Sequence, residues 1–232
     1  MSIMKPSSTP FHSPRRRFLA VLAGLAVALP LRSGASHQAW ASDPVTVLAL
    51  GDSLTAGYGL KQGEGFADQL QTAFRKMGRP VTVINGGVSG DTSAGGLSRI
   101  DWAMADKPAV VILELGANDM LRGIDPATTR TNLAGIVEKA KAGGAKVLLC
   151  GMKAQRNLGA DYVQKFDAIY PELAQQYGVV LYPFFMDGIV AADGTADTTL
   201  LQGDGLHPTE AGAKLIVDRI MPFVLKLIDG TP

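Results

Sequence analysis

Five short apolar runs rich in β-branched residues alternate with stretches of helical periodicity along this 232-residue chain. The strand-like runs are 45–50, 81–84, 109–113, 147–150 and 179–181. Strands that alternate with helices predict a parallel sheet covered by helices on both faces. The expected fold class is therefore α/β.

Helical spacing of apolar residues predicts helices in the intervening stretches, which are 66–77, 97–104, 125–143, 162–177 and 208–227. Asp125 followed by Pro126 is a strong helix start, because Asp caps free N–H groups and Pro suits the first helical position. Pro171 and Pro222 fall inside the last two stretches, where a proline is expected to break or disturb a helix.

The first 41 residues have the composition of an export signal. They contain five basic residues and no acidic residue, and 18–31 is an almost unbroken apolar run. This run is shorter than the roughly 20 residues that span a bilayer. Ala39-Trp40-Ala41 then provides small residues where a signal peptidase cuts. We expect residues 1–41 to be a removable signal peptide and residues 42–232 to form one domain.

The sequence Pro14-Arg15-Arg16-Arg17-Phe18-Leu19 resembles a twin-arginine export signal. An ordinary secretory signal with a basic start is the alternative. Either route predicts a periplasmic or secreted protein after cleavage between Ala41 and Ser42.

The charge of the expected mature domain argues against several partners. Removing the leader leaves 17 of the 22 basic residues against all 21 acidic residues, so the net charge becomes −4. No basic stripe remains for nucleic acid. No second long apolar segment predicts membrane insertion of the mature chain, and a monomer is the default expectation.

Cys150 is alone and lies in an apolar run, which predicts a core residue.

Polar residues and glycines follow the predicted strands. Asp52 and Ser53 come after the first strand, Gly90 after the second and Asn118 after the third. Ligands of parallel α/β sheets bind at the carboxyl ends of the strands. These residues, together with a loop before the last helix, are therefore expected to meet at one rim of the sheet.

Ser53 is a candidate nucleophile, and it needs a neighbouring base. His12 and His37 lie in the predicted leader, so His207 is the candidate base of the mature domain. Asp204 stands three residues before it and would orient the imidazole. Taken singly, Ser53 and Asp204 are equally suited to capping a helix or forming a turn, and His207 to a surface position.

Gly90 and Asn118 are candidates for an oxyanion hole, the first through its backbone N–H and the second through its side-chain amide. The Ser53 N–H would be a third donor. A tight turn for Gly90 and an Asx-turn for Asn118 are the alternatives. The sequence shows no cluster of metal ligands, so no metal or cofactor is expected.

Several segments of the chain resemble the SGNH, or GDSL-type, hydrolases, and in particular their bacterial arylesterase and thioesterase/lysophospholipase branch. These segments are Gly51–Gly59, Val88–Ser93, Glu114–Gly123, Ile169–Leu173, Pro183–Met186 and Asp204–Pro208. The resemblance implies a flavodoxin-like three-layer α/β/α sandwich of about five parallel strands. It also implies a catalytic triad of Ser53, Asp204 and His207, and an oxyanion hole formed by Ser53, Gly90 and Asn118.

The activity implied by this resemblance is hydrolysis of small aryl or alkyl carboxylic esters. Thioesterase or lysophospholipase activity with a longer acyl pocket, and carbohydrate O-deacetylation, are alternatives on the same fold. A non-catalytic periplasmic binding protein is a fourth possibility. Plausible apolar wall residues, which core packing explains equally well, are Val88, Met120, Leu121, Leu158, Phe184 and Phe185.

One loop departs from the pattern of the resembled group. Arylesterases of this kind often carry proline after a Met-x-Ala stretch, whereas here Met152-Lys153-Ala154 is followed by Gln155-Arg156-Asn157. The resemblance places this loop near the acyl pocket, so the difference bears on substrate choice. We expect Gln155 and Arg156 to be solvent-exposed.

Overall fold

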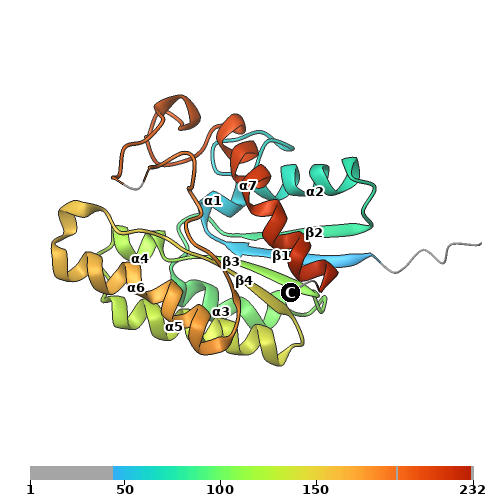
Figure 1. The fold of residues 1–232 in the computed structure, drawn as a ribbon, viewed down its shortest axis with the longest axis horizontal. Coiled ribbons are helices and arrows are strands. Elements are labelled where there is room, and N and C mark those ends of the chain that lie inside the picture. Colours follow the sequence, from blue (N-terminus) through green and yellow to red (C-terminus); the bar gives the residue numbers. More distant parts are fainter. Residues whose placement is uncertain (1–43, 192, 231–232) are drawn as a thin grey trace, which may run out of the picture. The chain divides into compact units, whose positions relative to one another are not determined.

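The computed structural model describes residues 44–191 and 193–230, and the predicted signal peptide lies outside them. The five strands of this part form a single parallel sheet, which confirms the predicted fold class (Figure 1). The strand order is β2-β1-β3-β4-β5. The strands are β1 (Val45–Gly51), β2 (Val81–Gly87), β3 (Val110–Glu114), β4 (Lys146–Cys150) and β5 (Val180–Tyr182).

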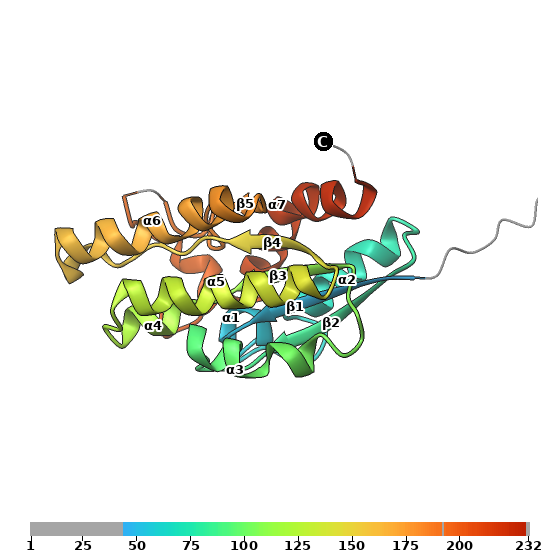
Figure 2. The same ribbon diagram turned by 90° about the horizontal axis from the view of Figure 1, so that it is seen from below.

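Helices cover both faces of the sheet, as Figures 1 and 2 show. Helices α2 (Phe66–Lys76) and α7 (Glu210–Asp229) pack against each other on one face. On the other face α5 (Pro126–Ala142) packs between α3 (Ser93–Ala103) and α6 (Ala160–Tyr177). The short helices are α1 (Ser53–Ala56), α4 (Ala117–Leu121) and the 3₁₀ turns η1 (Arg156–Leu158) and η2 (Thr198–Leu200).

The central strands are apolar because the two helical layers exclude water from them. Every residue of β3 is buried, and β1 is buried from Val47 onward. Strands buried on both faces read as continuous apolar runs rather than as alternating ones. Cys150 at the end of β4 is fully buried, as predicted.

The two internal prolines do not end their helices. Helix α6 continues past Pro171 to Tyr177, and α7 continues past Pro222 to Asp229. Proline costs a helix one hydrogen bond and some steric strain, but burial of an apolar face outweighs this cost. Tyr170 and Leu173, on either side of Pro171, are both buried.

Helix α7 begins at Glu210 rather than at Pro208, with the Thr209 hydroxyl accepting a hydrogen bond from the Gly212 N–H. The start of α5 is as predicted, since the Asp125 side chain accepts from the Ala127 N–H. None of the helices in the described ranges is long and apolar enough to cross a membrane.

Strand β2 is longer than its apolar run predicts. It continues through Asn85 to Gly87, because Gly86 and Gly87 pair with Leu50 and Gly51 at the end of β1. A Cβ atom on Gly87 would lie 2.3 Å from the Ala56 backbone nitrogen, so glycine is needed for α1 to sit on the strand. The loop that carries Gly90 therefore begins at Val88, three residues later than the sequence indicates.

We predict that Gly87→Ala lowers the free energy of unfolding by about 1–3 kcal/mol, because the new methyl group collides with the backbone of α1. Chemical denaturation measures the change. Gly203→Ala is the matched control, since a Cβ atom there meets nothing within 4 Å. Equal stability of the two variants would contradict the close approach of β2 to α1.

Candidate active site

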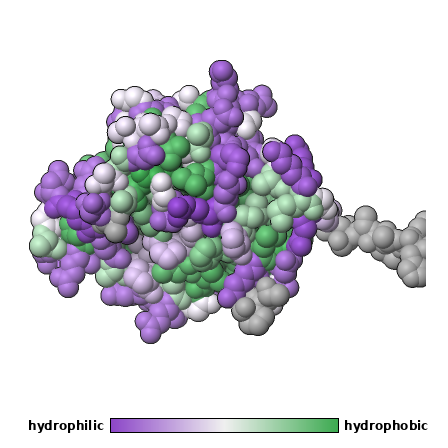
Figure 3. Space-filling model, turned by 45° about the horizontal axis from the view of Figure 1, so that its top comes forward, coloured by the Kyte–Doolittle hydropathy of each residue, from purple (hydrophilic) through white to green (hydrophobic). Residues whose placement is uncertain are grey.

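The carboxyl ends of the strands bring the predicted site residues together. Ser53 follows β1, Gly90 follows β2, Asn118 lies in α4 after β3, and His207 precedes α7. All four line one cavity of about 730 Å³. Figure 3 shows apolar surface gathered in patches among polar side chains on the face that this view brings forward.

Ser53, His207 and Asp204 form a continuous hydrogen-bonded relay. His207 Nε2 lies 2.8 Å from Ser53 Oγ, and His207 Nδ1 lies 2.6 Å from Asp204 Oδ2. The ring of Tyr58 packs at a tilt against the imidazole, with 4.7 Å between the ring centroids. The serine and the histidine are 154 residues apart in the sequence, so only the folded sheet brings them into contact.

A tight turn holds Asp204 in place for His207. The second carboxylate oxygen, Oδ1, accepts from the backbone N–H groups of Leu206 and His207. Gly205 adopts a φ of 68°, which favours glycine. The hydrogen bond with His207, followed by those from the backbone, lowers the pKa of Asp204 to about 2. The carboxylate is therefore ionised at neutral pH.

Ser53 is presented by the turn between β1 and α1. It is the first residue of a four-residue helix that Asp52 caps by accepting a hydrogen bond from the Leu54 N–H. Gly51 is required before this turn, because a Cβ atom there would lie 2.0 Å from Thr55 Oγ1. The serine hydroxyl consequently faces the cavity while Asp52 is buried beneath it.

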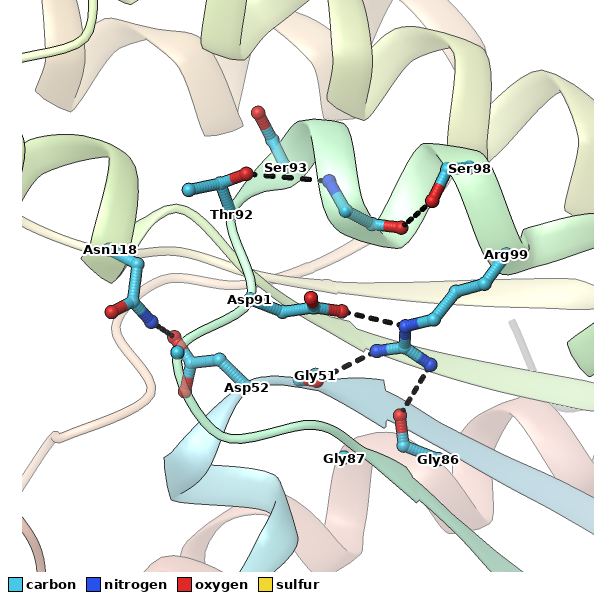
Figure 4. Close-up of polar contacts among 12 residues, drawn as sticks. Gly51, Asp52, Gly86, Gly87, Asp91, Thr92, Ser93, Ser98, Arg99 and Asn118 are labelled. Atoms are coloured by element: carbon cyan, nitrogen blue, oxygen red, sulfur yellow. Dashed lines mark hydrogen bonds and ion pairs between the residues drawn. The ribbon is translucent and has the colours of Figure 1, made fainter.

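Three donors at the cavity are available to a ligand. The N–H groups of Ser53 and Gly90 make no hydrogen bond within the described residues. The Asn118 amide gives one of its two hydrogens to Asp52 Oδ2, at 2.9 Å (Figure 4), and keeps the other. Gly90 has a φ of 84°, which places it in the region where glycine is favoured.

A pair of buried carboxyl groups, Asp52 and Glu114, lies close to Ser53. Burial raises the pKa of Asp52 to about 6, against the opposing effect of its hydrogen bonds from Leu54 and Asn118. Burial and the neighbouring charge of Asp52 raise the pKa of Glu114 well above its usual value. Glu114 Oε2 accepts from the Asp52 N–H and from Thr55 Oγ1. Both side chains are fully buried, and burial favours the protonated form of each.

The cavity wall matches the sequence-based expectation in part. Met120, Leu121 and Phe184 line the cavity. Phe185 instead packs in the core, edge-on to Phe66. Sequence reasoning missed other apolar residues of the wall, which include Leu54, Tyr58, Met186, Val190, Leu201 and Leu206. Val190 and Leu201 belong to the irregular segment before α7, where no periodicity marks them.

The loop from Met152 to Asn157 borders the cavity, as the resemblance implied. Its apolar members Met152 and Ala154 are buried, whereas Gln155 and Arg156 are exposed. Arg156 forms an ion pair with Asp167 at 2.8 Å. The departure from the expected proline therefore places two polar residues at the edge of the cavity.

Residues 49–215 match the GDSL-like Lipase/Acylhydrolase family. This match covers well over half of the chain and includes every residue of the site. The chain belongs to this family. Within the described part of this hydrolase, no group of three or more His, Cys, Asp or Glu side chains is arranged to hold a metal ion.

Curated relatives of this GDSL hydrolase extend over most of the same region. Esterase TesA of Pseudomonas aeruginosa is 40% identical over 184 residues, which cover 79% of this chain and 89% of that protein. An arylesterase of Vibrio mimicus is 35% identical over 181 residues, covering 78% and 88% respectively. The psychrotrophic esterase EstA from Pseudoalteromonas sp., solved with monoethylphosphonate as inhibitor, superimposes with a TM-score of 0.73 at 34% identity, covering 79% of this chain and 98% of EstA.

We predict that the stability of the wild-type protein falls relative to Asp52→Asn as pH rises from about 4 to 7. In this range the folded protein holds a proton on Asp52 that the unfolded chain has released, because the pKa is about 6 when folded against 3.8 when unfolded. The difference in unfolding free energy should change by about 2–3 kcal/mol.

Urea denaturation of both proteins at a series of pH values measures this difference. Asp106→Asn, at an exposed carboxylate, is the control and should run parallel to the wild type. Parallel curves for the wild type and Asp52→Asn would mean that Asp52 titrates normally in the folded state.

Proposed function

We propose that this protein is a serine esterase that hydrolyses carboxylic esters through an acyl-enzyme on Ser53. The observation that carries the proposal is the relay of two hydrogen bonds, 2.8 Å from Ser53 Oγ to His207 Nε2 and 2.6 Å from His207 Nδ1 to Asp204 Oδ2. A serine hydroxyl is a weak nucleophile unless a positioned base removes its proton.

In the first half of the reaction Ser53 Oγ forms a bond to the acyl carbonyl carbon while His207 Nε2 takes its proton. His207 then gives that proton to the leaving group, which departs as an alcohol or a thiol when its bond to the acyl carbon breaks. In the second half His207 deprotonates a water molecule, which attacks the acyl-enzyme and releases the acid. No oxidant, reductant or further reactant is needed.

Asp204 serves this cycle by holding the imidazole. Its carboxylate accepts from Nδ1, which leaves Nε2 free to act as the base toward Ser53. Because the pKa of Asp204 is lowered to about 2, the carboxylate also stabilises the imidazolium that forms during the reaction.

The developing negative charge on the carbonyl oxygen is assigned to the Ser53 N–H, the Gly90 N–H and the Asn118 amide. Each lines the cavity and has a hydrogen available. Preorganised donors of this kind contribute about 3–4 kcal/mol each to transition-state stabilisation. Asp52 supports this arrangement by accepting from Asn118 and so fixing its amide orientation.

Small aryl or alkyl esters are our first choice of substrate, in line with the esterase and arylesterase names of the relatives. A specific observation also favours a longer acyl chain. The cavity of about 730 Å³ is larger than an acetyl or butyryl group requires, and Met120, Leu121 and Phe184 give it an apolar wall. Thioesters, lysophospholipids and acetylated carbohydrates are the remaining substrates to be tested.

We also propose that residues 1–41 are a signal peptide of twin-arginine type and that the enzyme works in the periplasm or outside the cell. The basic, apolar and small-residue regions of this segment support the proposal. The N-terminal sequence of the exported protein would test it, with Ser42 as the expected first residue.

Ser53→Ala should lower kcat for p-nitrophenyl butyrate by at least about 10⁴-fold, because no other group replaces the attacking oxygen. Ser98→Ala, at an exposed serine on α3 outside the cavity, is the matched control and should retain full activity. Loss of labelling by a fluorophosphonate probe in Ser53→Ala alone would identify the nucleophile. Undiminished activity of Ser53→Ala would refute the proposed function.

The acyl specificity can be read from a p-nitrophenyl ester series from acetyl to palmitoyl. We expect the highest kcat/KM at short chains, with appreciable activity at medium chains because the cavity wall is apolar. A maximum at long chains would instead assign a thioesterase or lysophospholipase type of pocket. Activity confined to acetylated polysaccharide would assign a carbohydrate deacetylase.

A further inference from the structure

The guanidinium group of Arg99 connects the turn that carries Ser53 with the turn that carries Gly90. Its Nη2 donates to the Gly51 carbonyl at 2.9 Å, its Nη1 to the Gly86 carbonyl at 2.8 Å, and its Nε to Asp91 Oδ2 at 2.7 Å (Figure 4). The side chain is only 19% exposed. Arg99 belongs to α3 and does not line the cavity, so it acts on the site only through these acceptors.

The three acceptors lie on the two chain segments that carry the Ser53 and Gly90 N–H groups of the proposed oxyanion hole. Gly51 ends β1 and is followed directly by Asp52 and Ser53. Asp91 directly follows Gly90. Gly86 lies near the end of β2, on the strand that leads into the Gly90 turn. One planar group thus fixes the relative positions of two turns that must present N–H groups to the same oxygen atom.

The Gly90 turn is also held by backbone contacts. The Val88 N–H donates to the Gly51 carbonyl at 3.0 Å, which ties the start of the turn to the end of β1. The turn's internal hydrogen bond runs from the Asp91 N–H to the Val88 carbonyl at 3.0 Å, and the Gly90 carbonyl accepts from exposed Arg122. The Asp91 carboxylate fits over the first turn of α3 because residue 95 is glycine, where a Cβ atom would lie 2.5 Å from Asp91 Oδ1. The Arg99–Asp91 ion pair adds a partly buried side-chain restraint to these backbone contacts.

We propose that Arg99 is a positioning residue for the oxyanion hole. It sets the separation between the Ser53 N–H and the Gly90 N–H by bonding at once to Gly51, Gly86 and Asp91. This inference rests on the proposed esterase mechanism. Arginine is suited to the task because its rigid fork offers several donors in fixed directions, whereas lysine offers a single charged point.

If Arg99 has this role, replacing it should weaken stabilisation of the transition state without weakening substrate binding. Misplacing one oxyanion donor leaves ground-state binding nearly unchanged, because the charge develops only during attack. Arg99→Lys should lower kcat by about 10- to 100-fold with KM changed by less than about threefold. The affinity for a boronic acid inhibitor, which forms a tetrahedral adduct on the serine, should fall by a similar factor.

The experiment compares Arg99→Lys, Arg99→Ala and Asp91→Asn with the wild type, using p-nitrophenyl butyrate and counting active sites with a fluorophosphonate probe. Added guanidinium ion, far below denaturing concentrations, should restore part of the kcat of Arg99→Ala. Arg130→Ala is the matched control, since Arg130 bonds Glu172 and Gln176 on the outer helices, and its kcat should be unchanged.

An unchanged kcat per labelled site in Arg99→Lys, with only thermal stability lowered, would overturn the proposal, because a purely structural arginine gives that result. An increase in KM alone, or an equal loss in Arg130→Ala, would also overturn it. Should Arg99→Lys fail to fold, Asp91→Asn carries the same test with the arginine in place. If Ser53→Ala kept its activity, the esterase mechanism itself would be refuted, a result distinct from failure of the Arg99 variants.

Discussion

Most of the site depends on the position of β1 within the sheet. The strand pairs with β2 on one side and β3 on the other, and its apolar residues are covered by helices on both faces. Its carboxyl end is therefore held by a neighbouring strand on each side and by helices on each face. Ser53, the proposed nucleophile, lies two residues beyond this end, so the sheet positions it without a long loop.

The buried carboxyl groups beneath the nucleophile oppose this stability. Placing Asp52 and Glu114 close together out of water is unfavourable, as their raised pKa values indicate. Their hydrogen bonds to Leu54, Asn118 and Thr55 offset part of this cost. In return the nucleophile turn and the Asn118 amide are held in a single orientation, which is what an oxyanion hole requires.

The sequence predicted the sheet and the identities of the proposed relay residues, because both depend on local pattern. Apolar runs mark buried strands, and the loops that follow them must lie at one rim. Arg99 gave no such signal. It reads as one charged residue on a helix, and its three acceptors, Gly51, Gly86 and Asp91, come together only through strand pairing. Apart from Phe184, the apolar wall residues between β5 and α7 were missed for a related reason, since their place in the wall follows from tertiary contacts and not from periodicity.

The two internal prolines illustrate the opposite case, in which tertiary packing outweighs a local conformational preference. Pro171 and Pro222 disfavour helix at their own positions, yet both helices continue because each buries a long apolar face. Local preference is worth a few kcal/mol at one residue, and packing along a whole helix exceeds it.

The sequence separation between Ser53 and His207 has a consequence for when activity can appear during synthesis and folding. The first strand positions the serine, and the turn before the last helix positions the histidine. An incomplete chain, whether still being synthesised or cut short, contains the proposed nucleophile without the proposed base. Under the proposed mechanism the protein therefore cannot cleave esters until its C-terminal segment has docked, so ester hydrolysis would report assembly of the whole domain.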